Sequence, residues 1–461
     1  MFSIFDSTVK LCDGFSRREI LRAGSACLLG LPEIGGHLLA AREQGAPEPK
    51  ACIVLFLLGG PPQHSTWDPK PHAPSEVRGE FGPISTAVPG VQISELMPRT
   101  ARMMDRIALL RAVVTNDNAH SSSGYAMMTG QPHTPRNREN ANPGPPNNWP
   151  TMGAVVGYLS HGPQLLPAAV RLPHHIYNTD LSVWPGQDSG WLGPAADPWL
   201  LKCEPASPEF DLPQFRLQAD ISLGRLRNRQ SLLGQLESKL RLADQSGPAG
   251  AYSDQRRQAL NLLASPLARA ACDLWRETDQ ARDRYGRGQF GQSVLLARRL
   301  VESGVKFVQV NWFRGADEPA ANPCWDSHTD ETNRLKNVLV PPFDQAFSAL
   351  LDDLEQRGML DETLVVIMSE FGRTPKLDKR GGRGHWGYVF STALAGAGIR
   401  RGTVFGASDA HAAYPKADRV EPKDITATIF HCLGYHPQTV LHDPFGREFP
   451  ISRGRVIEEI V

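Results

Sequence analysis

The sequence lacks an excess of charge of either sign, because 49 lysine and arginine residues balance 49 aspartate and glutamate residues. A chain without a basic surplus is not expected to bind nucleic acid or an anionic membrane surface. The sequence also lacks an uninterrupted apolar run of about 20 residues, the length that a membrane-spanning helix needs. We therefore expect no nucleic-acid partner and no transmembrane span in the mature chain.

Cysteine is scarce and irregularly spaced, with seven residues in 461 and no CxxC pair. Two of the seven fall in a leader that we predict to be removed. The other five are Cys52, Cys203, Cys272, Cys324 and Cys432. An odd number excludes a complete disulfide framework, and the sequence does not determine the pairing of one or two bridges. We expect Cys52 and Cys272 to be buried as small hydrophobic residues.

The leader carries an export motif. Ser16–Arg22 reads SRREILR, which fits the twin-arginine pattern, and a nine-residue apolar run, Ala23–Leu31, follows it. That run is too short to cross a bilayer but fits the core of a signal peptide. We predict that residues 1–46 are a twin-arginine signal peptide and linker, cleaved near Ala40–Ala46, and that the protein is periplasmic or extracellular. The alternative is an amphipathic N-terminal helix with a chance arginine pair.

Residues 47–461 are predicted to form a single α/β domain with a doubly wound, mostly parallel sheet, because apolar strands alternate with polar loops and helices. Strands are expected at Ala51–Leu58, Ile107–Val114, Gly304–Trp312, Thr363–Ser369 and Val389–Ala395. Helices are expected at Leu96–Arg106, Leu335–Arg357 and Ile425–Leu433, with a short one after the polar loop Thr115–Gly124. Residues 131–300 are expected to cover the sheet, as loops and short strands and then as a helical insertion.

Polar residues follow the predicted strands at the points where the strands end. They are His64, Asp68, Asn116, Asp117, His120, Ser121, Asp326, His328 and Glu370, with His385 further on in a glycine-rich loop. Parallel strands bring their carboxyl ends to one edge of a sheet, so we expect these side chains to converge. Carboxylates and imidazoles are ligands for Zn²⁺, Mn²⁺, Fe, Mg²⁺ or Ca²⁺. The mixture fits a two-metal site that clamps a phosphate- or sulfate-like group.

Some of these residues have structural alternatives. A single loop histidine such as His64 is often a surface residue. Asp68 precedes a proline, where an aspartate commonly starts a turn. Asn116 and Asp117 have the side chains of helix N-caps. For these four residues, a structural role remains open beside a functional one.

Other candidates have stronger signals. Asp326 and His328, two positions apart, point the same way in an extended segment, which favours joint ligation. Glu370 ends a wholly apolar strand, so its carboxylate needs a partner, either Arg373 or a metal. His385 is flanked by a glycine-rich segment that lets the backbone approach closely. We expect these residues to belong to the functional site.

At these motifs the sequence resembles the domain-of-unknown-function 1501 (DUF1501) family of the alkaline phosphatase and sulfatase superfamily. The matching segments are SRREIL, FLLGGPPQHSTWDPKP, HSSSGYAMMTG, WDSH, FDQAFSALLDDLEQRGMLDETLVVIMSEFGRTP, GRGHWG and GTVFGASD. They extend from the leader to the last helix. The resemblance implies the superfamily's α/β fold and a hydrolase-like site with a divalent metal.

The resemblance implies a change at the nucleophile. In alkaline phosphatases and sulfatases, a Ser, Thr or modified Cys opens a helix ten residues before the Gly of a Thr-Gly pair. Counting back from Gly130 gives His120, with Ser121 one step later. His120 would act as nucleophile, general acid or base, or metal ligand, and the sequence does not choose between these roles.

The resemblance also implies an incomplete set of metal ligands. The Asp-His pair that is usual after the late strand is Glu370-Phe371 here, which loses one histidine. The aspartate that is usual after the first strand is replaced by Gly59-Gly60. The ligands carried over are Asp326, His328, Glu370 and His385, with His64 or Asp68 in place of the missing aspartate.

Two functions are compatible with this pattern, and we predict the first. It is an exported metal-dependent hydrolase of phosphate or sulfate esters, acting on a small-molecule or polysaccharide substrate. In it, His120 would attack or transfer protons at a helix N-terminus, and Arg373 would pair with the substrate's oxyanion or hold Glu370. The second is a non-catalytic descendant that binds a polysaccharide or a partner. Sugar stacking would use the tryptophans of the cap, Trp149, Trp184, Trp191 and Trp199.

Overall fold

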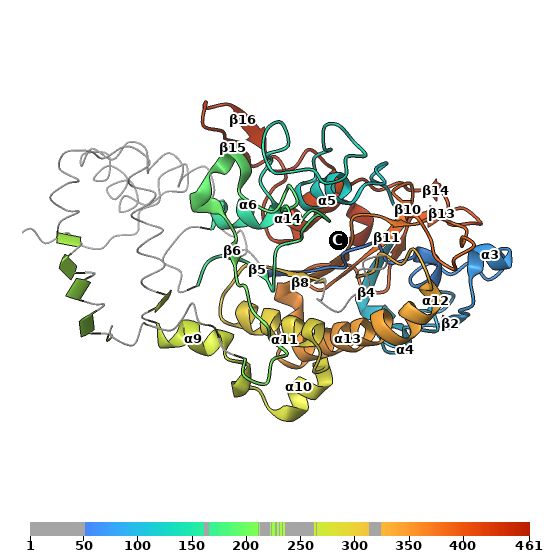
Figure 1. Cartoon of the computed structure of the whole chain (residues 1–461), viewed down its shortest axis with the longest axis horizontal. Coiled ribbons are helices and arrows are strands. Elements are labelled where there is room, and N and C mark those ends of the chain that lie inside the picture. Colours follow the sequence, from blue (N-terminus) through green and yellow to red (C-terminus); the bar gives the residue numbers. More distant parts are fainter. Residues whose placement is uncertain are drawn as a thin grey trace, which may run out of the picture. The chain divides into compact units, whose positions relative to one another are not determined.

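A sheet of eight strands forms the centre of the molecule. In the computed structural model the strand order is β12-β4-β11-β8-β1-β7-β5-β6 (Figure 1). The strands are β1 (Ala51–Phe56), β4 (Ile107–Val113), β5 (Ala169–Leu172), β6 (Trp199–Leu200), β7 (Phe307–Asn311), β8 (Thr363–Met368), β11 (Phe390–Ala395) and β12 (Val404–Phe405). β11 is antiparallel to both of its neighbours, and the other neighbouring strands pair parallel. The predicted mostly parallel, doubly wound sheet is confirmed.

The structure describes residues 51–160, 166–210, 265–312 and 324–461, with isolated positions between 212 and 263. The predicted signal peptide and much of the predicted helical insertion lie outside these residues. Within the described part of the chain, no helix combines the length and the apolar character needed to cross a membrane. Cys52 and Cys272 are buried, as predicted.

β1 lies in the middle of the sheet because its side chains are apolar on both faces. The strand reads ACIVLF, and every residue from Cys52 onward is fully buried. On one side it pairs with β7, where Phe56 lies opposite Asn311, and on the other with β8, where Phe56 lies opposite Met368. The three strands therefore end at the same level, and the loops that follow them leave from one edge of the sheet.

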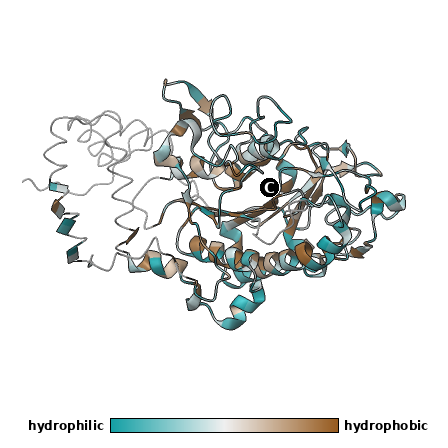
Figure 2. Cartoon of the chain, viewed as in Figure 1, coloured by the Kyte–Doolittle hydropathy of each residue, from teal (hydrophilic) through white to brown (hydrophobic). Residues whose placement is uncertain are grey.

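Helices cover both faces of the sheet (Figure 1). On one face, α11 (Gln289–Glu302) packs against α13 (Val340–Gln356) and contacts β1 and β7. On the other face lie α5 (His120–Thr129), α6 (Met152–Leu159) and α14 (Pro422–Cys432). Figure 2 shows apolar residues concentrated along the strands and hydrophilic residues mainly on the outer helices and loops. Burial of these apolar faces against the sheet is the main stabilising contribution to the fold.

The expected covering region, residues 131–300, contributes to the sheet itself. β5 and β6 are strands at one end of the sheet, and α11 is the helix that leads into β7. β5 has four residues and β6 has two, and strands this short give no recognisable hydrophobic pattern in the sequence. Short strands and a helix were expected in this region, but the two strands extend the central sheet and do not cover it, so only their expected position was wrong.

Two helix boundaries also differ from expectation. α5 begins at His120, inside the expected polar loop, because three serines form its first turn and serine in a sequence favours loops and caps. Leu96–Arg106 is divided into a short helix, α4 (Pro98–Ala101), and a 3-10 turn at Met104–Arg106. The proline at the start of α4 fits the first position of a helix.

Candidate metal centre

Five of the predicted residues converge at the edge of the sheet where β1, β7 and β8 end. They are His120, Asp326, His328, Glu370 and His385. Glu370 follows β8, while His385 opens β10 (His385–Trp386), a short strand rather than part of the expected loop. β10 pairs with β9 (Gly372–Arg373), which comes directly after β8. This pairing returns the chain to the end of β8, so His385 meets residues more than 50 positions away.

Three donor atoms form a nearly regular triangle. Asp326 Oδ1 lies 2.9 Å from Nε2 of His328 and 3.1 Å from Nε2 of His385. The two Nε2 atoms are 3.1 Å apart. Ligands bound to one metal ion at about 2.0–2.2 Å lie roughly 3 Å from each other. The two imidazoles and the carboxylate therefore have the spacing that one divalent ion requires.

The hydrogen bonding of His385 indicates that its Nε2 carries no proton. Its Nδ1 lies 2.8 Å from the carbonyl oxygen of Asn118, which can only accept, so Nδ1 holds the proton. Burial lowers the pKa of His385 to about 4, which keeps the ring neutral at pH 7. The lone pair of Nε2 then faces the carboxylate oxygen of Asp326. Two lone pairs repel each other at this distance, and a cation between them would remove the repulsion.

His120 bridges two carboxylates. Its Nδ1 donates to Glu370 Oε1 at 2.7 Å, and its Nε2 donates to Asp326 Oδ2 at 3.2 Å. Burial opposes the charged form of the ring, but the two carboxylates outweigh it and raise the pKa of His120 to about 10. The ring is therefore an imidazolium whose two N–H groups are both engaged, and its orientation is fixed.

Glu370 has its partner in His120 and not in Arg373. Its carboxylate also accepts the N–H of Gly59 and the hydroxyl of Ser369, each at 2.9 Å. The expected pairing of Glu370 with Arg373 is absent from the described contacts, because the guanidinium of Arg373 turns to a different carboxylate. Glu370 thus orients His120 and ties it to the end of β1.

Arg373 is fully buried, and its donors point at protein acceptors. Nη2 donates to Asp326 Oδ1 and to the carbonyl oxygen of Gly59, and Nε donates to the carbonyl oxygen of Gly60 at 3.0 Å. Burial would raise the pKa of Asp326, but the cations of Arg373 and His120 outweigh it and hold that pKa well below its usual range. Arg373 therefore fixes the carboxylate of Asp326, and its described donors point at protein acceptors and not at solvent, where a substrate oxyanion would bind.

A second buried ion pair anchors the loop that carries Asp326 and His328. Arg383 Nε donates to Glu331 Oε1 at 2.9 Å, and both side chains are almost inaccessible. Gly382 packs against the same loop so closely that a Cβ atom there would lie 2.1 Å from the carbonyl carbon of His328. A glycine is therefore needed for the two loops to meet.

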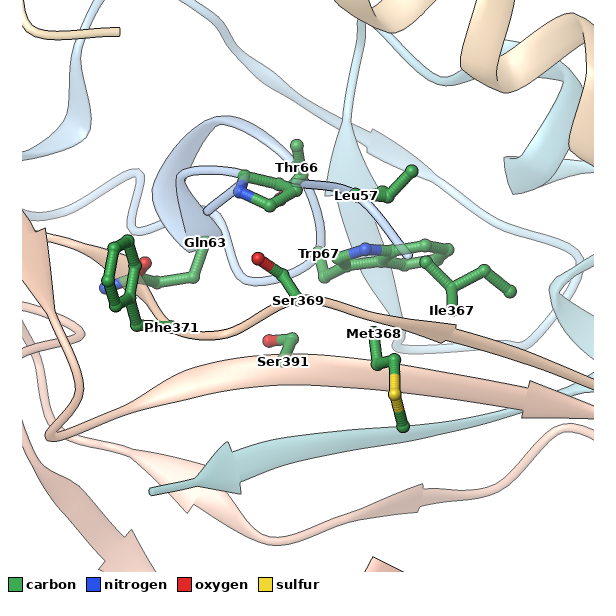
Figure 3. A pocket seen from close by; sticks show the side chains of 10 residues that line it. Leu57, Gln63, Thr66, Trp67, Ile367, Met368, Ser369, Phe371 and Ser391 are labelled. Atoms are coloured by element: carbon green, nitrogen blue, oxygen red, sulfur yellow. The ribbon is translucent and has the colours of Figure 1, made fainter. Parts of the chain in front are cut away.

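The solvent-accessible side of the site is formed by imidazole rings. The side chains of His120 and His385 are 18% exposed and that of His328 is 30% exposed. A cavity of about 10 Å³ beside the end of β8 lies between Trp67 and Ser391, with Ser369 in its lining (Figure 3). It has room for about one water molecule, so it does not admit a substrate. Solvent therefore reaches Asp326 Oδ1 and the two Nε2 atoms past the partly exposed histidine rings.

His64 and Asp68 have other partners. Both are buried; Nε2 of His64 lies 3.0 Å from the carbonyl oxygen of His411, while Asp68 accepts hydrogen bonds from Lys70 and Ser408. Burial lowers the pKa of His64 well below its ordinary value. Among the described contacts, neither residue touches the three donors. The structure does not bring these two predicted metal ligands to the site.

Ser121 is an anchoring residue. It is fully buried; its hydroxyl donates to the carbonyl oxygen of Arg138 at 2.9 Å and accepts the N–H of Ala141 at 3.0 Å. The hydroxyl of Ser121 therefore holds a loop against α5. Among the described contacts, it does not touch Asp326, His328 or His385, as a catalytic residue of the expected site would.

Asp117 accepts the hydroxyl of Ser122 at 2.8 Å and the N–H of Ala119 at 3.0 Å. The N-cap of α5 is Ala119, which makes no side-chain capping hydrogen bond, so the expected N-cap role of Asn116 or Asp117 was wrong.

Sequence reasoning missed Glu139. Its Oε1 accepts the N–H of His120 at 3.0 Å and lies 3.8 Å from Nδ1 of His385. No sequence signal marks it, because it follows no strand and lies in a region of weak periodicity. His120, Glu139 and His385 also place donor atoms within 4.8 Å of one another. However, both ring nitrogens of His120 already face carboxylates, so the Asp326 group is the better metal centre.

The chain has only distant similarity to the solved structures that it matches. No curated protein matches the chain by sequence. Among solved structures, the PsFucS1 sulfatase from Pseudoalteromonas sp. is 13% identical, with 91% of this chain and 72% of that chain covered and a TM-score of 0.37. The alkaline phosphatase from the Antarctic bacterium TAB5 is 12% identical, with 84% and 99% covered and a TM-score of 0.35. Similarities at this level carry no information on activity.

The family assignment comes from the sequence. Residues 49–461 match the family described as "Protein of unknown function (DUF1501)". The match includes all the strands of the central sheet and the residues that converge at its edge. The chain is therefore a member of the DUF1501 family.

Proposed function

We propose that the protein is a metal-dependent hydrolase of phosphate or sulfate esters, with one divalent ion held by Asp326, His328 and His385. The observation that supports this most strongly is the triangle of donor atoms, in which a neutral imidazole turns its lone pair toward a carboxylate oxygen. Two nitrogen donors and one oxygen suit Zn²⁺, Mn²⁺ or Fe better than Mg²⁺ or Ca²⁺, which prefer oxygen ligands. A bound ion would polarise the ester and stabilise the developing negative charge.

The chain's own groups would provide orientation and a proton. His120 is held between two carboxylates and keeps a proton at Nε2, beside Asp326 Oδ2 and on the accessible side of the site. To act as general acid, His120 would exchange its Nε2 hydrogen bond with Asp326 for one to the leaving-group oxygen of the ester. Ser121 is too deeply buried and too fully hydrogen-bonded to serve as a nucleophile. We therefore favour hydrolysis by water over a covalent intermediate on Ser121.

The engaged hydroxyl of Ser121 also favours the alternative, a non-catalytic protein that keeps the fold to bind a polysaccharide or a partner. In that case the cluster would be structural. The alternative explains less, since a purely structural cluster has no reason to set the lone pair of His385 against Asp326.

We also propose that the protein leaves the cytoplasm by the twin-arginine route, on the basis of SRREILR in the leader. That segment lies outside the described residues. A protein exported after folding would carry its metal with it, which fits a site whose ligands come from distant parts of the chain.

The proposed hydrolase activity predicts a metal-dependent response to a single substitution. We expect the purified mature protein, without a histidine tag, to cleave at least one member of a panel of phosphate and sulfate esters, and a chelator to abolish this activity. His385→Ala should lose it as well, because one of three ligands is removed. His72→Ala, at an exposed histidine outside the site, is the matched control and should keep full activity. Equal turnover by wild type and His385→Ala would remove His385 from the proposed mechanism.

A further inference from the structure

Glu139 places a negative charge at the rim of the proposed site. It lies in the segment that joins α5 to α6, and its side chain is 46% exposed. Its carboxylate accepts the N–H of His120 and lies 3.8 Å from Nδ1 of His385. A molecule that approaches His385 from solvent therefore meets this carboxylate.

The charge of Glu139 is not neutralised by a cation of its own. Among the residues that the structure describes, its only ion-pair contact is with His385, whose Nδ1 proton already goes to Asn118. The other two carboxylates have close partners: Asp326 pairs with Arg373, and both Asp326 and Glu370 bind His120. Glu139 is the most exposed of the three carboxylates and is the one that a substrate would meet first.

We propose that Glu139 sets the charge of the ester that the site accepts, favouring monoanions such as sulfate monoesters and phosphate diesters over dianionic phosphate monoesters. The inference rests on the proposed hydrolase function and names its substrate class. A dianion brings one more negative charge close to Glu139 than a monoanion does. For unit charges about 4–6 Å apart in surroundings close to water, that repulsion is a factor of roughly three to six in kcat/KM.

The test compares three chromogenic substrates in wild type and Glu139→Gln, both loaded with the same metal. They are p-nitrophenyl phosphate, bis-p-nitrophenyl phosphate and p-nitrophenyl sulfate. Glutamine keeps an oxygen that can accept the N–H of His120, so the change removes charge with little change in shape. The assay is run at pH 8, where the phosphate monoester is a dianion. Burial raises the pKa of Glu139, and an alkaline pH favours the ionised form of its carboxylate.

We expect wild type to prefer the two monoanions. In Glu139→Gln the ratio of kcat/KM for the phosphate monoester to that for the diester should rise about three- to sixfold at low ionic strength, and less in high salt. Metal content and Tm should not change. Glu448→Gln, at an exposed glutamate on the β15–β16 hairpin (Val440–His442 and Glu448–Pro450), is the control and should leave the ratio as it is.

Each other result overturns the inference in a distinguishable way. An active Glu139→Gln with an unchanged ratio would contradict it and leave the hydrolase proposal standing. If Glu139→Gln loses its metal, Glu139 is a metal ligand and does not act by discriminating between substrate charges. If wild type cleaves none of the three substrates with Zn²⁺, Mn²⁺ or Mg²⁺, the proposed function fails and the inference fails with it.

Discussion

Replacing Arg373 with methionine should lower the free energy of unfolding by about 3–5 kcal/mol, the usual loss when one partner of a buried ion pair is removed. The guanidinium is fully buried and binds Asp326 together with the carbonyl oxygens of Gly59 and Gly60. Methionine fills much of the same volume but leaves a buried carboxylate without its cation and two carbonyl groups without this donor. Urea unfolding of the metal-free proteins measures the difference.

The control for this experiment is Arg380→Met. Arg380 is exposed and pairs with Asp378 at the surface, so its loss should change stability by no more than about 0.5 kcal/mol. Arg373→Lys keeps the charge but loses the planar set of donors, so we expect its free energy of unfolding to lie between those of wild type and Arg373→Met. If Arg373→Met does not fold, Arg373→Lys provides the measurement. If the two methionine variants are equally stable, Arg373 does not hold the site together.

Asp326→Asn should abolish metal binding and reduce ester hydrolysis by about a thousandfold or more, the scale of several kcal/mol that a Lewis-acid ion contributes. The substitution keeps the shape of the side chain but removes the charge that both histidine ligands, Arg373 and His120 face. Steady-state kinetics and metal analysis on the same preparation measure the two effects.

Asp330→Asn is the matched control, because it lies four residues further along the same loop and is exposed. Its backbone has a positive φ of 48°, a conformation that asparagine adopts readily. It should keep full metal content and activity. Retention of more than about a tenth of wild-type turnover by Asp326→Asn would mean that this carboxylate does not hold a catalytic ion.

The position of the site was predictable from the sequence because it depends on topology. Apolar runs such as Ala51–Leu58 and Thr363–Ser369 identify buried parallel strands, and their carboxyl ends must share an edge of the sheet. Asp326, His328, Glu370 and His385 follow such strands or lie in loops that return to them. The structure shows that these four side chains and His120 do meet.

The partners of each side chain were not predictable, because they depend on directions that the sequence pattern does not encode. Glu370 and Arg373 are three residues apart, yet one turns to His120 and the other to Asp326. Glu139 reaches the site from a loop without periodicity. Residue spacing predicts which loops converge, but side-chain rotamers decide which atoms meet.

The most direct test of this description is the number of metal ions per chain. We expect mature, untagged protein that has been incubated with Zn²⁺ or Mn²⁺ and then desalted to retain one ion per chain, and Asp326→Asn to retain none. A protein that folds normally but retains no ion at all would contradict the proposal that an imidazole lone pair and a carboxylate oxygen 3.1 Å apart are held there by a shared cation. Two tightly bound ions per chain would contradict the single-ion centre.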